Sequence, residues 1–217
     1  MTFRWWERWG SLLGVLAVVC WIVSFAVGGS TPDTSDTDAK IASYFASHSH
    51  QVRQILGWFI FLAGILLFVG FLAALRSRLV AAEGPGGRLS ALAYGSGLIS
   101  AALWAVALSA FQAPAFLAND TRAADLDPGA FRIFNDFGYE VWVAAVITGA
   151  ILLWATAALA LRTAMLPRWF AWISIVAGVV LLFAVVFIPV FVYWGWILVA
   201  SGLLVWRRAE VTPAPAT

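Results

Sequence analysis

The sequence predicts an all-α membrane protein, a polytopic bundle of six transmembrane helices, and three observations lead to this fold class. Five long apolar runs free of charged residues alternate with short charged connectors. Hydrophobic residues make up 63% of the 217 residues and charged residues 11%, a balance far from that of soluble domains. The last run, Trp169 to Trp206, has 38 residues. A single helix through it would be roughly 57 Å long, against a hydrocarbon core of about 30 Å, so this run must fold back. The six expected spans are residues 10–28, 55–75, 89–113, 139–161, 169–187 and 190–206.

The distribution of basic residues predicts the orientation of the bundle. Nine arginines fall in the segments on one side and four basic residues fall on the other, and Lys and Arg in short loops favour the cytoplasm. Both termini are therefore expected to be cytoplasmic, with the bundle in the inner (plasma) membrane. The inner set is Arg4, Arg8, Arg76, Arg78, Arg88, Arg162, Arg168, Arg207 and Arg208; the outer set is Lys40, Arg53, Arg122 and Arg132.

The two ends of the chain are expected to lie outside the bundle. Residues 1–9 combine three tryptophans with two arginines, which is typical of an interfacial anchor. The first apolar run is long for a cleaved signal peptide and contains Trp21 and Phe25, so an uncleaved signal anchor is expected. Residues 207–217 contain two prolines and are predicted to be a disordered cytoplasmic tail.

A short amphipathic helix is predicted on the outer side, between the first two spans. Ser35 and Asp38 have the spacing of a capping box. One apolar stripe at helical spacing follows, formed by Ile41, Tyr44, Phe45 and His48.

The later connectors are expected to be loops. Pro114 to Tyr139 is rich in Asp and Ala and is predicted to be an outer loop with a turn at Asp127-Pro128-Gly129. Pro167 is well placed to begin the fifth span, and Pro189 marks the outer turn before the sixth.

Small residues and tryptophans indicate how the helices pack. Pairs of small residues four apart let helix backbones approach closely, either within one chain or against a protein partner or a second copy. These pairs are Gly10 with Gly14, Ala91 with Gly95, and Ser174 with Gly178. Most tryptophans are expected at the two membrane interfaces, with Trp58, Trp142, Trp194 and Trp196 in the outer belt.

The five apolar runs contain no Asp, Glu, Lys, Arg or His, and Glu140 lies at the outer mouth of the fourth expected span. Ion-coupled pumps, proton relays and voltage sensors usually depend on such groups, so these classes are disfavoured. The only lysine, Lys40, is in an outer segment, which argues against a retinal Schiff base, and no intramembrane histidine is available to bind haem. No catalytic constellation is found either, so we expect neither an enzyme nor a cofactor. The basic residues border apolar runs, so the expected partner is the lipid bilayer and not nucleic acid.

Candidate site residues therefore lie mainly in the outer segments. His48 and His50 are weak metal candidates, because side chains two apart on a helix point about 200° apart. Glu140 is expected either to pair with Arg53 or Arg132, or to face a ligand in an outward cavity. Such a cavity would be lined by Gln112, Asn119, Asn135 and Asp136. A carrier would need this cavity to reach mid-membrane beside Tyr94 and Ser100, whereas a packed interior would argue against transport.

Three segments carry a family resemblance: Asp38 to His48, Phe71 to Leu79, and Leu166-Pro-Arg-Trp169. In these the chain resembles uncharacterised six-span bacterial membrane proteins, of actinobacterial type, grouped under a domain-of-unknown-function heading. The resemblance covers residues 10–206 and implies topology without a mechanism. The expected function is that of a non-enzymatic membrane protein, an accessory or interaction subunit; the alternative is a carrier or channel for a small neutral or lipidic compound.

Overall fold

The computed structural model describes residues 9–120 and 127–209, and within these ranges the regular structure is entirely helical. The expected interfacial anchor, apart from Trp9, and the expected tail beyond Ala209 lie outside the described residues, as does the middle of the second outer connector. The elements are α2 (Leu13–Gly28), α3 (Asp38–Ala46), α4 (His48–Glu83), α5 (Arg88–Asp120), α6 (Pro128–Thr163), α7 (Arg168–Leu181), the 3-10 turn η2 (Ala184–Val186) and α8 (Pro189–Ala209).

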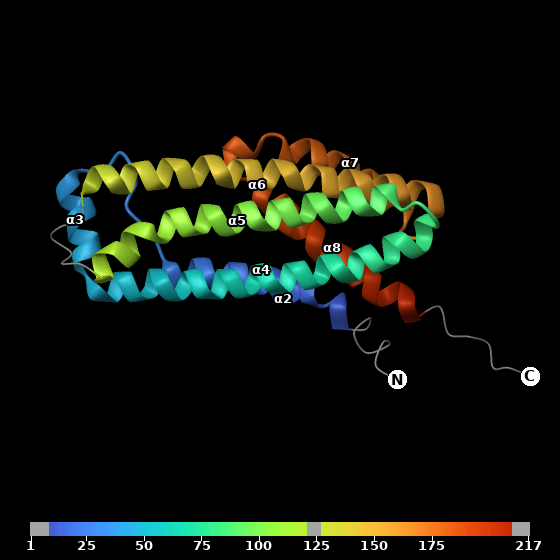
Figure 1. The fold of residues 1–217 in the computed structure, drawn as a ribbon, viewed down its shortest axis with the longest axis horizontal. Coiled ribbons are helices and arrows are strands. Elements are labelled where there is room, and N and C mark those ends of the chain that lie inside the picture. The colour runs from blue at the N-terminus through green and yellow to red at the C-terminus, as the bar shows by residue number, and fades with distance from the viewer. Residues whose placement is uncertain (1–8, 121–126, 210–217) are drawn as a thin grey trace, which may run out of the picture.

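The helices form an elongated bundle (Figure 1). Helices α2, α4, α5 and α6 run along its long axis, with α2 packed on α4, α4 on α5, and α5 on α6. The short helix α3 covers one end. The start of α2 and the end of α8 lie at the opposite end, which we call the terminal end.

The helices confirm the predicted all-α class, and their length and apolar character are those of a membrane protein. Among the described residues, four helices are long and apolar enough to cross a membrane: α4, α5, α6 and α8. Helices α2 and α7 are apolar but shorter. With 14 residues, α7 is only about 21 Å long, less than the thickness of a hydrocarbon core.

Three helices, α4, α5 and α6, extend well beyond the expected spans. Helix α6 has 36 residues, about 54 Å, and begins at Pro128 instead of near residue 139. Asp127 caps it by accepting a hydrogen bond of 3.0 Å from Gly129 N, and proline at the first helical position requires no amide hydrogen. Helix α5 continues through Pro114 to Asp120. The expected loop from Pro114 to Tyr139 is therefore helical over most of its described length.

The last apolar run folds back as predicted, and α8 begins at Pro189. The connection is η2, followed by Phe187 with a φ of 31°. Its position is set by α6, because the Tyr139 hydroxyl donates to the Val185 carbonyl and the Phe187 ring stacks on Trp142 at 5.6 Å. The turn consequently lies part-way along α6 and does not reach the end covered by α3 (Figure 1).

The predicted outer helix is present as α3, with differences at both of its ends. Its N-cap is Thr37, whose side chain accepts from Lys40 N, and not Ser35. Ile41 and Phe45 are buried against α5 and α6, as the apolar stripe predicted. His48 does not belong to the stripe, because α3 ends at Ala46 and His48 begins α4.

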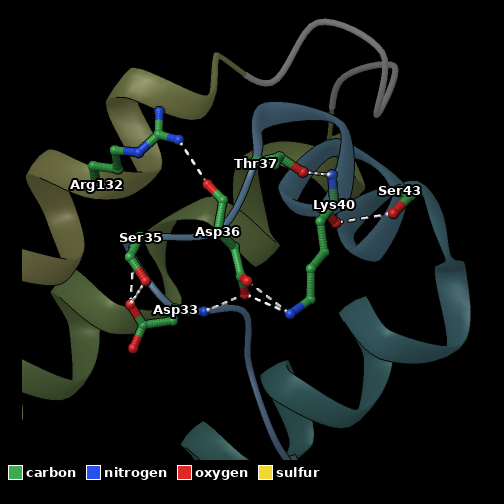
Figure 2. Close-up of polar contacts among 7 residues, drawn as sticks. All are labelled: Asp33, Ser35, Asp36, Thr37, Lys40, Ser43 and Arg132. Carbon is green, nitrogen blue, oxygen red and sulfur yellow. Dashed lines mark hydrogen bonds and ion pairs between the residues drawn. The ribbon is translucent and has the colours of Figure 1, made fainter.

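Arg132 of α6 holds the segment before α3 in place (Figure 2). Its guanidinium donates to the carbonyls of Thr34 and Asp36, at 2.9 and 3.0 Å. It also pairs with Asp38 Oδ1 at 2.7 Å. One side chain thus satisfies two backbone acceptors and one carboxylate at the entrance to α3.

Two of the expected small-residue pairs mediate close helix packing. A Cβ atom added at Gly14 would lie 2.2 Å from Ser201 Oγ, and one added at Gly178 would lie 2.3 Å from Trp154 Nε1. One added at Gly10 would lie 2.7 Å from Ala74 Cβ. Gly95 differs, because nothing lies within 4 Å of the position of its Cβ, so this pair faces away from the bundle.

A layer of stacked aromatic rings fills the centre of the bundle. Trp21 stacks on Trp104 with ring centroids 5.0 Å apart, and Trp104 lies 4.5 Å from Trp142. Trp142 and Trp194 are buried here instead of forming an outer belt as expected, since only 2% and 5% of their surfaces are exposed. We call this set the aromatic layer: Trp21, Phe61, Trp104, Trp142 and Trp194.

Candidate ligand-binding site

A cavity of about 260 Å³ lies between the aromatic layer and the end of the bundle covered by α3. Helices α2, α4, α5 and α6 contribute its walls, and Phe187 contributes from the α7–α8 turn. We call it the outer cavity, and its lining residues are Ser24, Phe25, Gly28, Gly29, Thr31, Gln54, Gly57, Leu108, Phe111, Gln112, Phe131, Asn135, Tyr139, Trp142 and Phe187.

The lining of the outer cavity carries no charged side chain. Six aromatic residues and one leucine make the apolar part of the wall, and five amide or hydroxyl side chains are present besides the tyrosine. This is the composition of small-molecule sites, in which apolar walls provide contact area and a few polar groups fix the orientation. An apolar cavity of about 150 Å³ is enough to bind benzene, so the outer cavity has room for a group larger than one aromatic ring.

Two glutamines form the main polar feature of the wall. Gln112 Nε2 donates to Gln54 Oε1 at 2.9 Å. Gln54 Nε2 in turn donates to the Gly28 carbonyl and the Tyr44 hydroxyl, each at 3.0 Å. Because the Gly28 carbonyl can only accept, it fixes the orientation of the Gln54 amide, and that orientation fixes the amide of Gln112.

Two residues that line the cavity, Gln112 and Trp142, each have a buried polar atom without a hydrogen-bond partner. Gln112 is 8% exposed, and its Oε1 atom is buried without a hydrogen-bond partner. The indole N–H of Trp142 is also buried and unpaired. A buried polar atom without a partner costs about 1–3 kcal/mol, so a ligand that offers it a hydrogen bond would gain affinity from that contact.

The inner end of the outer cavity is closed. Ser24 Oγ donates to the Gly57 carbonyl at 2.7 Å and ties α2 to α4. Below this bond lies the aromatic layer. Ser100, expected to border a mid-membrane cavity, is buried and donates to the Ala145 carbonyl at 2.7 Å, while the Tyr193 hydroxyl donates to it at 3.4 Å. The cavity therefore ends above the middle of the bundle.

The residues expected from the sequence to line a ligand cavity divide between three places. Gln112 and Asn135 line the outer cavity. Asp136 and Glu140 are exposed on α6 and do not line it. Tyr94 lies towards the terminal end of α5, with the Arg76 guanidinium 5.0 Å above its ring.

The expected partners of Glu140 are engaged elsewhere. Arg132 pairs with Asp38, and Arg53 Nε donates to the Val27 carbonyl at 3.1 Å. Over the described ranges the ion pairs are Lys40–Asp36 and Arg132–Asp38, so neither arginine forms the ion pair with Glu140 that the sequence suggested.

The two histidines do not approach each other as metal ligands. His50 Nδ1 lies 3.1 Å from the Tyr44 carbonyl, and its ring stacks on Tyr44 at 4.3 Å. His48 is exposed at the start of α4. In the part of the chain that the structure describes, no group of three or more His, Cys, Asp or Glu side chains could hold a metal ion.

A second hollow, of about 570 Å³, adjoins the outer cavity on the side of α3. It shares Gly28, Gly29 and Thr31 with the outer cavity, and its lining includes three basic side chains but no acidic one. We call it the basic cleft, and it is lined by Gly28, Gly29, Ser30, Thr31, Pro32, Lys40, Ser43, Tyr44, His50 and Arg53.

Sequence reasoning did not find three of the important lining residues. Gln54 could have been found, because it is an amide at the boundary of an apolar run. Nothing in the sequence indicated that Trp142 or Phe187 would line a cavity. Their position in the wall depends on where the α7–α8 turn lies against α6, which the sequence does not specify.

Comparisons with known proteins define the family of this chain. No curated protein and no solved structure is significantly similar to it. The sequence pattern of the DUF4386 family, described as a domain of unknown function, matches residues 10–207. Because this match covers most of the chain and includes every helix of the bundle up to the last turn of α8, the protein belongs to the DUF4386 family.

Proposed function

We propose that this protein binds a small neutral or lipidic compound in the outer cavity and is not an enzyme. The observation that carries the proposal is the composition of the outer cavity, whose uncharged lining combines six aromatic residues with a few amide and hydroxyl side chains, among them Gln112 with its unpaired Oε1. A molecule with an apolar body and a hydroxyl group would satisfy both features.

The proposal includes a topology of six membrane crossings with both ends in the cytoplasm of a bacterial cell. The start of α2 and the end of α8 lie at the same end of the bundle, which supports an even number of crossings (Figure 1). Arg76, Arg78, Arg88, Arg162 and Arg168 lie near the helix ends that face the terminal end, in keeping with a cytoplasmic location of that end. The outer cavity then opens towards the outer surface of the plasma membrane.

Binding is favoured over conduction because the interior is packed below the cavity. The aromatic layer fills the space that a channel would need, and Ser100 is already hydrogen-bonded there. A carrier would have to separate Trp21, Trp104 and Trp142 in each cycle, which would break several stacked contacts.

An accessory role is the second candidate function, and the exposed small residues of α5 favour it. Ala91 is exposed and Gly95 has open space where a Cβ would be, so a helix of another protein or of a second copy could approach there. Ligand binding and such an association are compatible, because Gly95 lies near the terminal end and far from the outer cavity along α5.

The experiment is a binding measurement on the full chain in nanodiscs of zwitterionic lipid, with 2-phenylethanol as the probe and empty nanodiscs as the reference. Asn135→Phe places a ring in the outer cavity, whereas Asp136→Phe adds the same ring at an exposed neighbour that does not line it. Saturable binding should occur in the wild type and in Asp136→Phe and be lost in Asn135→Phe. If the wild type shows no saturable signal, or if both variants behave alike, the proposal is wrong.

A further inference from the structure

We infer that the outer cavity and the basic cleft form one site for an amphipathic anion, a molecule with an apolar body, a hydroxyl group and a carboxylate or phosphate head. This inference rests on the proposed function, because the apolar body would occupy the outer cavity. The two hollows share Gly28, Gly29 and Thr31, so a ligand that crosses this short segment would contact both.

Arg53 is the cation best placed to bind the head. It lines the basic cleft, and within the described residues it has no carboxylate in ion-pair distance. Its Nε atom is engaged by the Val27 carbonyl, which fixes the guanidinium in position and leaves its terminal nitrogens to face an anion. Lys40 contributes less, because Asp36 lies 2.7 Å from its ammonium group.

His50 adds a second donor or acceptor to the cleft. Its Nδ1 faces the Tyr44 carbonyl, which can only accept, so the proton of the neutral ring lies on Nδ1. Nε2 is then left as a hydrogen-bond acceptor in the cleft, available to a ligand hydroxyl. No acidic side chain lines the cleft to compete for these groups.

The order of side chains along α4 matches the order of groups in an amphipathic molecule. His50 and Arg53 line the basic cleft, Gln54 lies at its boundary with the outer cavity, and Gly57 lies inside that cavity. These positions fall on successive turns of one helix, so the surroundings change from cationic to apolar over about 10 Å. A lipid in the outer leaflet has the same arrangement, with its head outward and its apolar part inward.

The glutamine pair assigns the hydroxyl group. Gln112 Oε1 lacks a donor, and its partner Gln54 borders the cleft through its bond to the Tyr44 hydroxyl. A ligand hydroxyl that reaches Gln112 would therefore be near the anionic head. This points to a hydroxy acid or a single-chain glycerolipid phosphate, two sources of the same chemistry.

Glycine at position 29 keeps the passage between the hollows open. Its φ is 71°, a conformation that other residues rarely adopt, and a Cβ there would lie 3.0 Å from the Arg53 guanidinium. The backbone can therefore lie against Arg53 without covering the face that an anion would contact.

The test compares two soluble probes with the same apolar body on the full chain in zwitterionic nanodiscs. The anion is 3-phenyllactate, and its uncharged counterpart is 3-phenylpropane-1,2-diol. At low salt the anion should bind about fivefold or more tightly than the diol, and added salt should reduce this difference. Arg53→Gln should abolish the difference and Arg53→Lys should retain most of it, and in Arg53→Gln the loss of affinity should be much larger for the anion than for the diol.

The outcomes separate this inference from the proposed function. If anion and diol bind equally to the wild type, or if Arg53→Gln retains the preference, the inference fails while ligand binding in the outer cavity stands. If neither the anion, nor the diol, nor a lysophosphatidic acid binds to the wild type, the inference and the proposed function both fail.

The source of the ligand is tested in a parallel arm. Nanodiscs doped with a lysophosphatidic acid are analysed by native mass spectrometry for retained lipid. Retention by the wild type and loss in Arg53→Gln would identify a membrane lipid as the source. Preference for 3-phenyllactate without lipid retention would identify a water-soluble hydroxy acid as the source. Either result supports a site for an amphipathic anion with a hydroxyl group.

Discussion

Gln112 on α5 donates a hydrogen bond of 2.9 Å to the side-chain oxygen of Gln54 on α4. Gln54 in turn donates to the carbonyl of Gly28 on α2 and to the hydroxyl of Tyr44 on α3. Two adjacent amides thus join four helices at the level of the outer cavity. Apolar surface gives little drive for helices to associate in lipid, so such directed contacts help to set how the helices pack.

We expect Gln112→Leu to destabilise the protein by about 1 kcal/mol, because Gln54 Oε1 would lose its donor, while removal of the unpaired Gln112 Oε1 offsets part of that cost. The measurement is the free energy of unfolding in mild detergent. Ser109→Ala is a matched control on the same helix, since Ser109 Oγ only bonds to the Ala105 carbonyl of its own helix, and it should change stability by less than about 0.5 kcal/mol. Equal stability of Gln112→Leu and the control would mean that the glutamine pair contributes nothing.

Much of the fold follows from the sequence for a simple physical reason. The hydrocarbon core requires long apolar helices, so the runs identify them, and Pro189 identified the start of α8 because proline lacks an amide hydrogen. Helix ends outside the apolar runs were not predictable in this way. Pro128 reads as a turn in the sequence, yet it begins α6, because the carboxylate of Asp127 caps a helix there.

The candidate site was less predictable, because tertiary packing decides which side chains share a space. Gln112 and Asn135 were expected beside a cavity and do line it, whereas Glu140 lies only five residues further along α6 and is exposed. The sequence also suggested Trp142 for the outer belt, because this residue lies at the boundary of an expected span. Its burial depends on contacts with the rings of Phe187 and Trp104, and both rings come from distant parts of the chain.

Gly14→Ala should destabilise the bundle by about 1–3 kcal/mol, because the added Cβ would lie 2.2 Å from Ser201 Oγ and 2.8 Å from the Phe71 ring. Gly95→Ala is the matched control at an open position. Alanine is the better helix former, so this variant should be as stable as the wild type or more stable by up to about 1 kcal/mol. The midpoint of thermal unfolding should therefore fall for the first variant and not for the second; the opposite order would contradict the packing described above.

Arg132→Ala should loosen the segment from Thr34 to Ala46, because it removes the donor to the Asp36 carbonyl (Figure 2). It also removes the donors to the Thr34 carbonyl and to the Asp38 carboxylate. Hydrogen exchange followed by mass spectrometry should show lower protection in α3, with α7 unchanged as an internal reference. Arg132→Lys keeps the positive charge, but an ammonium group cannot donate to all three acceptors as the planar guanidinium does. The effect of this variant should therefore be intermediate. Unchanged protection of α3 in Arg132→Ala would show that the buried contacts of Ile41 and Phe45 suffice to hold it.

The same segment should respond to acid through Asp36. The hydrogen bond from the Lys40 ammonium, followed by that from Asp33 N, lowers the pKa of this carboxyl below its ordinary value. A carboxyl whose folded pKa is depressed stabilises the fold above its unfolded pKa, and that contribution is lost as the pH falls through the folded value. Protection of α3 against hydrogen exchange, corrected for the intrinsic rate, should therefore stay constant from neutral pH down to about pH 4 and decrease below it. Asp36→Asn should reduce protection at neutral pH and flatten this acid dependence, whereas an acid response identical to that of the wild type would assign the loss to other groups.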